Sequence, residues 1–231
     1  MLVETGVFAA VSAAMFVSTV GFIAFYMLGN HNDRYFFVPP AITAVAGLAY
    51  AGMAASSHGL IAADVILELR YVDWLITTPL IVLHIGLVAG ASRRTIGAAM
   101  AADAVMIAAG FVATTSTGAV SWAGFAVSSA AFLAVVYLLL TSVTAGVRGE
   151  TAAVQGTFRT LRDLTIALWA VYPLIWLVGP YAGGVIALAD YHFIIAVLDT
   201  TAKVGFSAIV AFGMARVGDL FESADAVPAP E

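Results

Sequence analysis

Charged residues and cysteine are what this sequence lacks most. Of its 231 residues only 10% are charged, with 9 Lys and Arg against 14 Asp and Glu, whereas 62% are hydrophobic. A soluble domain usually carries about 25% charged residues, so this chain has too little charge to cover a surface in water. The scarcity excludes a soluble enzyme, a nucleic-acid-binding protein and a disordered chain. It predicts a protein that lies almost entirely within a membrane.

The absence of cysteine is complete. It excludes disulfide bonds and any metal site with cysteine ligands, and we predict no metal site of another kind. The N-terminus also lacks the basic residues that begin a signal peptide, and its apolar run over 7–28 is too long for a signal-peptide core. We interpret this run as the first membrane-spanning segment.

Long hydrophobic runs are what the sequence has instead. They cover residues 4–28, 36–57, 68–89, 94–115, 120–144, 160–179 and 186–216. Runs of about 18 or more apolar residues are typical of transmembrane helices, which satisfy their backbone hydrogen bonds internally. A β-barrel would need alternating segments of roughly ten residues, which the sequence does not show. The predicted fold is an all-α membrane protein, a seven-transmembrane-helix bundle.

The few basic residues predict how this bundle is oriented. With seven spans, the loops and ends on one side of the membrane carry Arg34, Arg93, Arg94, Arg148, Arg159, Arg162 and Arg216. Positive charge collects on the cytoplasmic side, so we expect an extracellular N-terminus and a cytoplasmic C-terminus in a multi-pass protein of the plasma membrane. No repeat divides the chain, and we expect a single domain over 1–231 that ends in a disordered tail from about 218 to 231.

The other two basic residues, Arg70 and Lys203, lie inside or at the edge of apolar spans. Arg70 and Asp73 are three residues apart and Asp199 and Lys203 are four apart, so each pair shares one face of its helix. Ionisable groups at membrane depth are costly and usually mark a functional site. The spacing predicts a compact buried network of two cations and two carboxylates.

A buried lysine has two sensible roles, as a structural ion-pair partner or as the amine that forms a Schiff base with a carbonyl cofactor. Aromatic residues occur in the same spans: Trp74 in the third, and Trp169, Tyr172 and Trp176 along one stripe of the sixth. Such a stripe is often only core or an interfacial belt. Together with Lys203, it favours a cofactor pocket.

Three motifs then resemble a known family. RYVDWLITTPL (70–80), LWAVYPLIW (168–176) and LDTTAKVGF (198–206) are similar to the third-, sixth- and seventh-helix signatures of the microbial, or type 1, rhodopsins of haloarchaea. The motifs occur in the family's order, and the resemblance covers essentially the whole chain. It implies a photoreceptor, not an enzyme, that binds all-trans retinal through a protonated Schiff base at Lys203.

The resemblance also implies roles for individual residues. Asp73 would be the primary counterion and proton acceptor, Asp199 the second member of the counterion complex, and Arg70 the extracellular-side cation coupled to both. The residues expected to line the retinal or lie close to it are Tyr50, Trp74, Thr77, Thr78, Met106, Trp169, Tyr172 and Trp176. Thr77 follows Asp73 by one helical turn, where its hydroxyl can bond that carboxylate. Asp103 is expected to pair with Thr78 as a neutral structural acid.

The position of His84 departs from the family's proton pumps. In those pumps an acid lies eleven residues after the primary acceptor, about 16 Å along the helix, and returns the proton to the Schiff base. Here that position is His84. A neutral histidine in an apolar half-channel is a poor proton donor. The alternative interpretation is an interior histidine that is hydrogen-bonded to a neighbour.

The residues expected on the extracellular side also differ from those of the family's proton pumps. Tyr181 and Tyr191 take the places of the pump's two proton-releasing glutamates, and neither ionises as a carboxylate does. The nearby acids either substitute for those glutamates or, as we expect, are solvated loop charges; they are Glu4, Asp64, Glu68 and Asp190. His192 either touches the extracellular network or lies at the interface. Against a sensor, Ala202 stands where blue-absorbing sensors often carry threonine.

Two functional hypotheses follow. The first is a sensory, phototaxis-type rhodopsin that signals to a separate two-helix transducer in the membrane through its sixth and seventh helices. The second is a light-driven outward proton pump. The aspartate at 73 excludes chloride-pump chemistry, where the family has threonine. In either case the lipid bilayer surrounds the protein, and its many Ala and 21 Gly residues permit close helix packing and homo-oligomers.

Overall fold

The computed structural model describes residues 2–28, 37–62 and 65–213, with side chains from Gly6 onward. Within these ranges seven helices are long and apolar enough to cross a membrane, and no strand occurs. The predicted all-α seven-helix fold is therefore confirmed. The tail over 218–231 and two of the basic residues, Arg34 and Arg216, lie outside the described ranges.

The spans follow one another in the predicted order. The first four are single helices: α1 (Leu2–Leu28), α2 (Val38–Ser57), α3 (Ile66–Val88) and α4 (Arg93–Thr115). The fifth consists of α5 (Gly118–Leu138), η1 (Leu139–Val143), α6 (Thr144–Gly146) and η2 (Val147–Gly149). The sixth consists of α7 (Ala152–Trp169) and α8 (Val171–Val178). The seventh runs from Leu188 to Gly213 and contains α9 (Leu188–Thr200) and η3 (Thr201–Gly205).

Local sequence explains where several helices begin. Prolines occupy the first turn of α2, where no backbone N–H is needed for the helix. The hydroxyl of Ser92 accepts a hydrogen bond from the backbone N–H of Thr95 and caps α4, and Thr151 caps α7 in the same way through Val154. At Gly118 the backbone has a positive φ of 60°, which favours glycine just where α4 turns into α5.

The sixth helix begins at Ala152 rather than at residue 160, so the break predicted there is shorter than expected. Its first turns are amphipathic: Val154, Phe158 and Leu161 are buried, while Arg159 is exposed. A prediction based on continuous hydrophobic runs misses such an end, because polar residues alternate with apolar ones at helical spacing.

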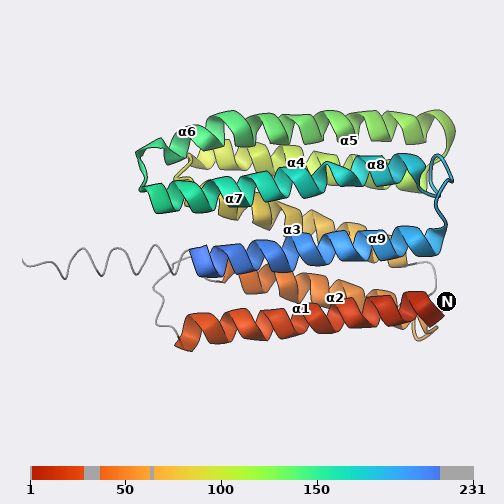
Figure 1. Ribbon diagram of the computed structural model, residues 1–231. Coiled ribbons are helices and arrows are strands. Elements are labelled where there is room, and N and C mark those ends of the chain that lie inside the picture. Colours follow the sequence, from red (N-terminus) through yellow and green to blue (C-terminus); the bar gives the residue numbers. More distant parts are fainter. Residues whose placement is uncertain (1, 29–36, 63–64, 214–231) are drawn as a thin grey trace, which may run out of the picture.

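The third and seventh spans lie in the middle of the bundle. In Figure 1, α3 and α9 lie between the α1–α2 pair on one side and α4, α5, α7 and α8 on the other. η3 is a π-helical turn, and Lys203 is at its centre. Such wide turns are rare and frequently mark functional sites. The central position brings the residues of α3 and α9 within reach of each other.

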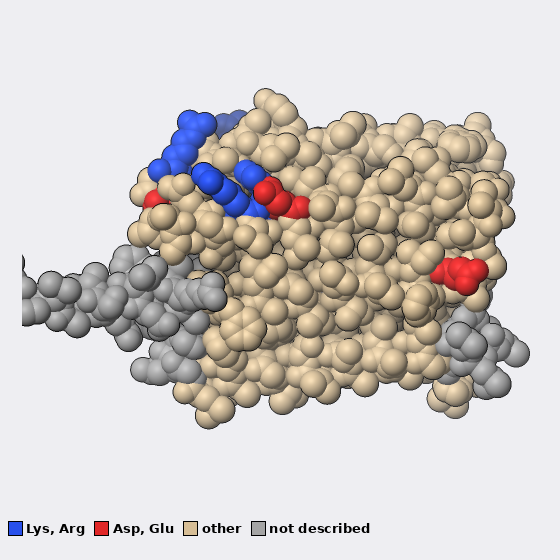
Figure 2. All heavy atoms as spheres, in the orientation of Figure 1, with Lys and Arg blue, Asp and Glu red and all other residues tan. Residues whose placement is uncertain are grey.

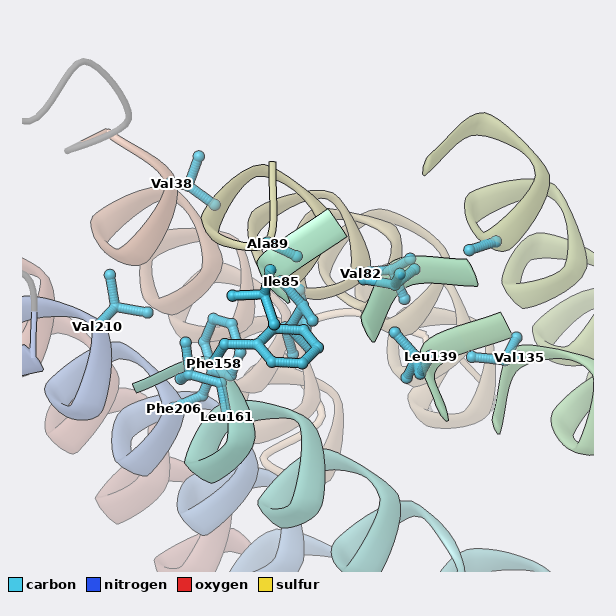
Figure 3. Close-up of a cluster of buried hydrophobic side chains, with 14 of the residues drawn as sticks. Val38, Val82, Ile85, Ala89, Val135, Leu139, Phe158, Leu161, Phe206 and Val210 are labelled. Carbon is cyan, nitrogen blue, oxygen red and sulfur yellow. The ribbon is translucent and has the colours of Figure 1, made fainter. Parts of the chain in front are cut away.

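Apolar side chains fill one half of the bundle. Figure 3 shows part of this cluster, with Val38 from α2, Ile85 from α3, Leu139 from η1, Phe158 from α7 and Phe206 from the seventh span. Each of these five side chains is at most 1% exposed. Water is therefore excluded from the space between these helices.

The basic residues gather at the end of the bundle where this apolar cluster lies. Figure 2 shows the blue side chains around the turn from α6 to α7. The described basic residues of the predicted cytoplasmic side are Arg93, Arg94, Arg148, Arg159 and Arg162, which begin α4, follow α6 and belong to the first turns of α7. Arg70 and Lys203 are instead buried inside the bundle.

Candidate functional site

The ammonium group of Lys203 lies between two carboxylates from two helices. Its Nζ is 2.6 Å from Oδ2 of Asp73 on α3 and 3.6 Å from Oδ2 of Asp199 on α9. The three residues are 2%, 0% and 1% exposed, respectively. A charge this deeply buried needs a partner, and the two carboxylates supply it. Three members of the network that the spacing predicted, Lys203 and the two carboxylates, thus lie together.

Three other helices hold Asp199 in place. The hydroxyl groups of Tyr50 on α2 and Tyr172 on α8 each donate a hydrogen bond of 2.7 Å to its carboxylate. The indole N–H of Trp74 on α3 donates a third, 3.0 Å long. Hydrogen bonds to a carboxylate stabilise its charged form.

The carboxylate of Asp73 accepts hydrogen bonds from fewer side chains than the carboxylate of Asp199 does. The hydroxyl of Thr77 lies 3.3 Å from its Oδ1, but the same hydroxyl lies only 2.8 Å from the backbone carbonyl oxygen of Asp73. A hydroxyl has one proton, so the shorter contact takes most of it. Apart from Lys203, the Asp73 carboxylate therefore receives weak support, in contrast to Asp199.

The expected pair of Asp103 and Thr78 is also present. The Thr78 hydroxyl lies 2.8 Å from Oδ2 of Asp103 and 2.7 Å from the backbone carbonyl of Trp74, so it links α3 to α4. Asp103 is fully buried. Its place beside a hydroxyl in an apolar region suits a neutral acid better than an ionised one.

The guanidinium group of Arg70 is completely buried, one turn before Asp73. Its nitrogens have no hydrogen-bond partner among the residues that the structure describes. The guanidinium carbon lies 5.9 Å from the ring centre of Tyr191, a distance that allows a cation–π interaction. Tyr181 packs edge-on against Tyr191, with ring centres 5.3 Å apart.

Tyr181 and Tyr191, the two tyrosines expected in the places of the pump's glutamates, therefore lie together near Arg70. Burial raises the pKa of the Tyr181 phenol, and the nearby Arg70 only partly opposes this rise. Tyr181 is thus neutral at physiological pH. Of the four acids named for this end, Glu68 and Asp190 are exposed, while Asp64 and the side chain of Glu4 lie outside what the structure describes.

His192 lies inside this end of the bundle rather than at the interface. It is 6% exposed, and its ring centre is 5.5 Å from that of Phe8 and 6.0 Å from that of Tyr191. Of the two alternatives given for His192, the structure shows contact with the extracellular network, through Tyr191 beside Arg70.

A cavity opens beside Lys203, and aromatic side chains form much of its wall. The residues predicted for such a pocket that line it are Trp74, Thr78, Met106, Trp169, Tyr172 and Trp176. Tyr50 and Thr77 are not among the lining residues and instead contact the two carboxylates.

Sequence reasoning missed the contribution of α5 to this wall. Phe125, Ser128, Ser129 and Phe132 all line the cavity. They follow one another at i, i+3, i+4 and i+7, a spacing that puts them on one helix face. That periodicity was the available signal, but no charged residue within α5 draws attention to it.

His84 is buried in the apolar half of the bundle. It is 1% exposed, and neither of its ring nitrogens has a hydrogen-bond partner within the described part of the chain. Its ring meets Phe206 edge-on, with centres 6.0 Å apart. Among the described residues, the structure therefore shows no neighbour that is hydrogen-bonded to His84.

These features define a class of protein, a seven-helix membrane protein with one buried amine at the edge of an aromatic cavity. The amine, the two carboxylates and the apolar walls fit an elongated hydrocarbon chromophore that carries an aldehyde. The amine can bond the aldehyde carbon, the carboxylates can balance the resulting cation, and the aromatic rings can pack against the hydrocarbon.

Comparison with known proteins shows which family this is. The family model for bacteriorhodopsin-like proteins matches residues 3–217. Sensory rhodopsin III of Haloarcula marismortui is 37% identical over 224 residues, which are 96% of this chain and 97% of that protein. The chain belongs to the bacteriorhodopsin-like family of microbial rhodopsins, as its motifs predicted. Rhodopsins of this family bind retinal as their chromophore. With its seven apolar helices, this chain is a multi-pass membrane protein.

Solved structures agree with this assignment. The thermophilic rhodopsin from Rubrobacter xylanophilus is 33% identical with a TM-score of 0.83, covering 94% of this chain and 99% of that one. A protein described as a light-driven proton pump, LR (Mac) from Leptosphaeria maculans, is 26% identical with a TM-score of 0.85, covering 93% and 96%.

Proposed function

We propose that this protein is a retinal photoreceptor that acts as a sensory rhodopsin, with all-trans retinal joined to Lys203. When bound, retinal supplies the absorption of visible light and a light-driven change of shape at the Lys203 nitrogen. The chain's own residues then determine where a proton goes. The buried position of Lys203 between two carboxylates supports this role.

Asp73 is the proposed proton acceptor. It is the carboxylate closest to the Lys203 nitrogen, at 2.6 Å, and it has weaker support from other donors than Asp199 has. Asp199 accepts hydrogen bonds from Tyr50, Tyr172 and Trp74, which hold its carboxylate in place. We therefore assign proton uptake to Asp73 and the role of a fixed counter-charge to Asp199, while Arg70 balances the pair.

The environment of His84 is the observation that carries the sensory assignment. The pump's internal acid is replaced by an imidazole in a dry, apolar region, without a hydrogen-bond partner among the described residues. A neutral imidazole there returns a proton slowly. Slow return prolongs the light-activated state, which benefits a signalling protein and limits a pump. The relative named sensory rhodopsin III agrees with this assignment.

A groove on the outer surface, between the sixth and seventh spans, is the observation that favours a partner protein at this place. Its lining includes Ala152, Gly156 and Thr157 from α7 and Ala208 and Gly213 from the end of the seventh span. Small side chains let a second helix approach closely within a membrane. We propose that a two-helix transducer packs here. The groove lies at the end of the bundle that carries the basic residues, which we assign to the cytoplasm of the cell by the positive-inside rule.

The alternative function is a light-driven outward proton pump. Ala202, which stands in place of the threonine of many sensors, favours it, as does the similarity to LR (Mac). The two functions differ in what sustained light does to a closed vesicle. A pump moves protons for as long as the light lasts, whereas a sensor without its donor exchanges them only on single turnovers.

We expect illuminated, unbuffered vesicles that contain the protein to show a brief pH change and no sustained proton export. The reason is the slow return of the proton through the apolar half around His84. A pH electrode with and without an uncoupler measures the effect, and vesicles with the Lys203→Ala variant provide the dark baseline. Sustained export at many protons per second, abolished by the uncoupler, would contradict the sensory assignment.

Replacing His84 by aspartate should shorten the slowest phase of the photocycle, by up to about 100-fold, because an internal acid then supplies the proton. Azide, a small proton carrier, should accelerate the same phase in the wild-type protein. Flash photolysis measures both effects. His58→Asp is the matched control, since His58 is exposed and should leave the rate unchanged. An unchanged rate in His84→Asp would show that position 84 is outside the proton path.

A further inference from the structure

The hydroxyl of Thr114 connects three helices at the wall of the cavity. Its Oγ1 accepts a hydrogen bond of 3.1 Å from the indole N–H of Trp176 on α8. It also lies 2.8 Å from the hydroxyl of Tyr71 on α3 and 2.9 Å from the backbone carbonyl oxygen of Gly110 on α4, and the Tyr71 hydroxyl lies 3.0 Å from that same carbonyl oxygen. With one proton and two lone pairs, the hydroxyl satisfies all three contacts when it donates to Gly110 and accepts from the other two.

Thr114 itself does not line the cavity, but Trp176 and Tyr71 do. Trp176 stacks on Phe125 of α5, with ring centres 4.5 Å apart and planes 14° from parallel. Only the hydroxyl at position 114 accepts from the Trp176 indole among the described hydrogen bonds. The orientation of this part of the wall therefore depends on a side chain behind it.

The same hydroxyl leads back to the charged network. Tyr71 packs edge-on against Trp74, with ring centres 5.1 Å apart. Trp74 in turn donates its indole N–H to Asp199, the carboxylate 3.6 Å from the Lys203 nitrogen. A continuous series of contacts thus runs from Trp176 through Thr114, Tyr71 and Trp74 to Asp199.

We propose that Thr114 is a positioning residue that fixes the ring planes of Trp176 and Tyr71, and through them the shape of the chromophore cavity and the hydrogen bond of Trp74 to Asp199. The inference rests on the proposed retinal site. A buried indole N–H needs an acceptor, and valine at position 114 would fill the same volume but offer none. The wall would then lose its fixed orientation while the fold keeps its packing.

The test compares Thr114→Val with Thr114→Ser in the retinal-reconstituted protein. We expect Thr114→Val to shift the absorption maximum and to bleach in hydroxylamine in the dark about fivefold faster, the factor that loss of one buried hydrogen bond typically produces. Thr114→Ser keeps the hydroxyl and should restore both properties. The matched control is Thr115→Val, because Thr115 is exposed and its hydroxyl bonds only the backbone carbonyl of Phe111. It should behave as the wild type.

A second readout needs no chromophore. Ultraviolet resonance Raman spectra of the retinal-free protein report the hydrogen bonding of indole N–H groups, and the chain has 4 tryptophans. Thr114→Val should shift the signal of one of them toward a free N–H, and Thr114→Ser should not. If the wild type takes up no retinal, the proposed function fails, while this spectrum still decides whether Thr114 holds Trp176.

Three results would overturn the proposal. The first is an unchanged Raman signal in Thr114→Val. The second is a Raman change with no effect on colour or bleaching in a protein that does bind retinal. The third is a serine variant that resembles the valine variant, since the hydroxyl would then not be the cause. If Thr114→Val does not fold, Tyr71→Phe removes one of the same hydrogen bonds and should give a smaller shift and faster bleaching, and the absence of both would count equally against the proposal.

Discussion

Replacing Lys203 by alanine abolishes the visible absorption of the protein after incubation with retinal. Lys203 is the only lysine in the chain, so no other side-chain amine is present to form the covalent bond. Its Nζ lies at the edge of the aromatic cavity, beside two carboxylates that balance a cation there. An absorption spectrum of the purified protein measures the result, and the expected loss is complete.

The control for this experiment is Lys203→Arg. The alanine variant leaves two buried carboxylates without their cation, which destabilises the fold by about 3–5 kcal/mol on its own. Arginine keeps a positive charge between Asp73 and Asp199 but its guanidinium stays protonated and forms no bond with an aldehyde. We expect Lys203→Arg to fold and to remain colourless. Visible colour in either variant would show that the chromophore is attached elsewhere or is absent from this cavity.

Replacing Asp73 by asparagine has the second largest expected effect. It removes the negative charge closest to the Lys203 nitrogen without changing the shape of the side chain. The positive charge of the chromophore then loses its nearest stabilising partner, so its absorption moves to longer wavelength. Light-driven proton transfer to position 73 stops, because an amide does not accept the proton. A spectrum and flash photolysis with a pH-indicator dye measure the two effects.

Two comparisons sharpen this prediction. Asp163→Asn is the matched control, since the side chain of Asp163 is 61% exposed and pairs only with Arg162 at the basic end of the bundle. It should change neither colour nor proton transfer. Asp199→Asn should shift the colour but leave a proton acceptor in place. Undiminished proton transfer in Asp73→Asn would assign the acceptor role to Asp199 instead.

The buried charges were the part of the site that could be predicted best. Arg70, Asp73, Asp199 and Lys203 stand out because ionisable residues are rare in apolar spans, and their spacing places each pair on one face of a helix. Spacing within a helix does not tell which helices are neighbours. The contact of Asp73 with Lys203 across two spans was implied by the family resemblance, and the structure supplies its distance of 2.6 Å.

Other features could not be predicted because they depend on neighbours from several helices. Neither ring nitrogen of His84 has a hydrogen-bond partner among the described residues, and its ring meets Phe206 of the seventh span, a contact that the sequence does not reveal. The hydroxyl of Thr114 is one of many in the chain, and only the packing of α3, α4 and α8 brings Tyr71 and Trp176 to it. The start of α7 at Ala152 was hidden by its polar face.

The π-helical turn around Lys203 has a mechanical consequence. A regular α-helix is stiff because each carbonyl is bonded at a constant spacing, whereas a π turn interrupts that spacing over 201–205. The seventh span therefore consists of two helical segments that meet at the turn around Lys203. The segment before the turn, α9, contains Asp199, and the segment after it ends at Gly213 in the groove beside α7. If a bound chromophore pulls on the Lys203 side chain, we expect the seventh span to bend at this turn and its end beside α7 to tilt.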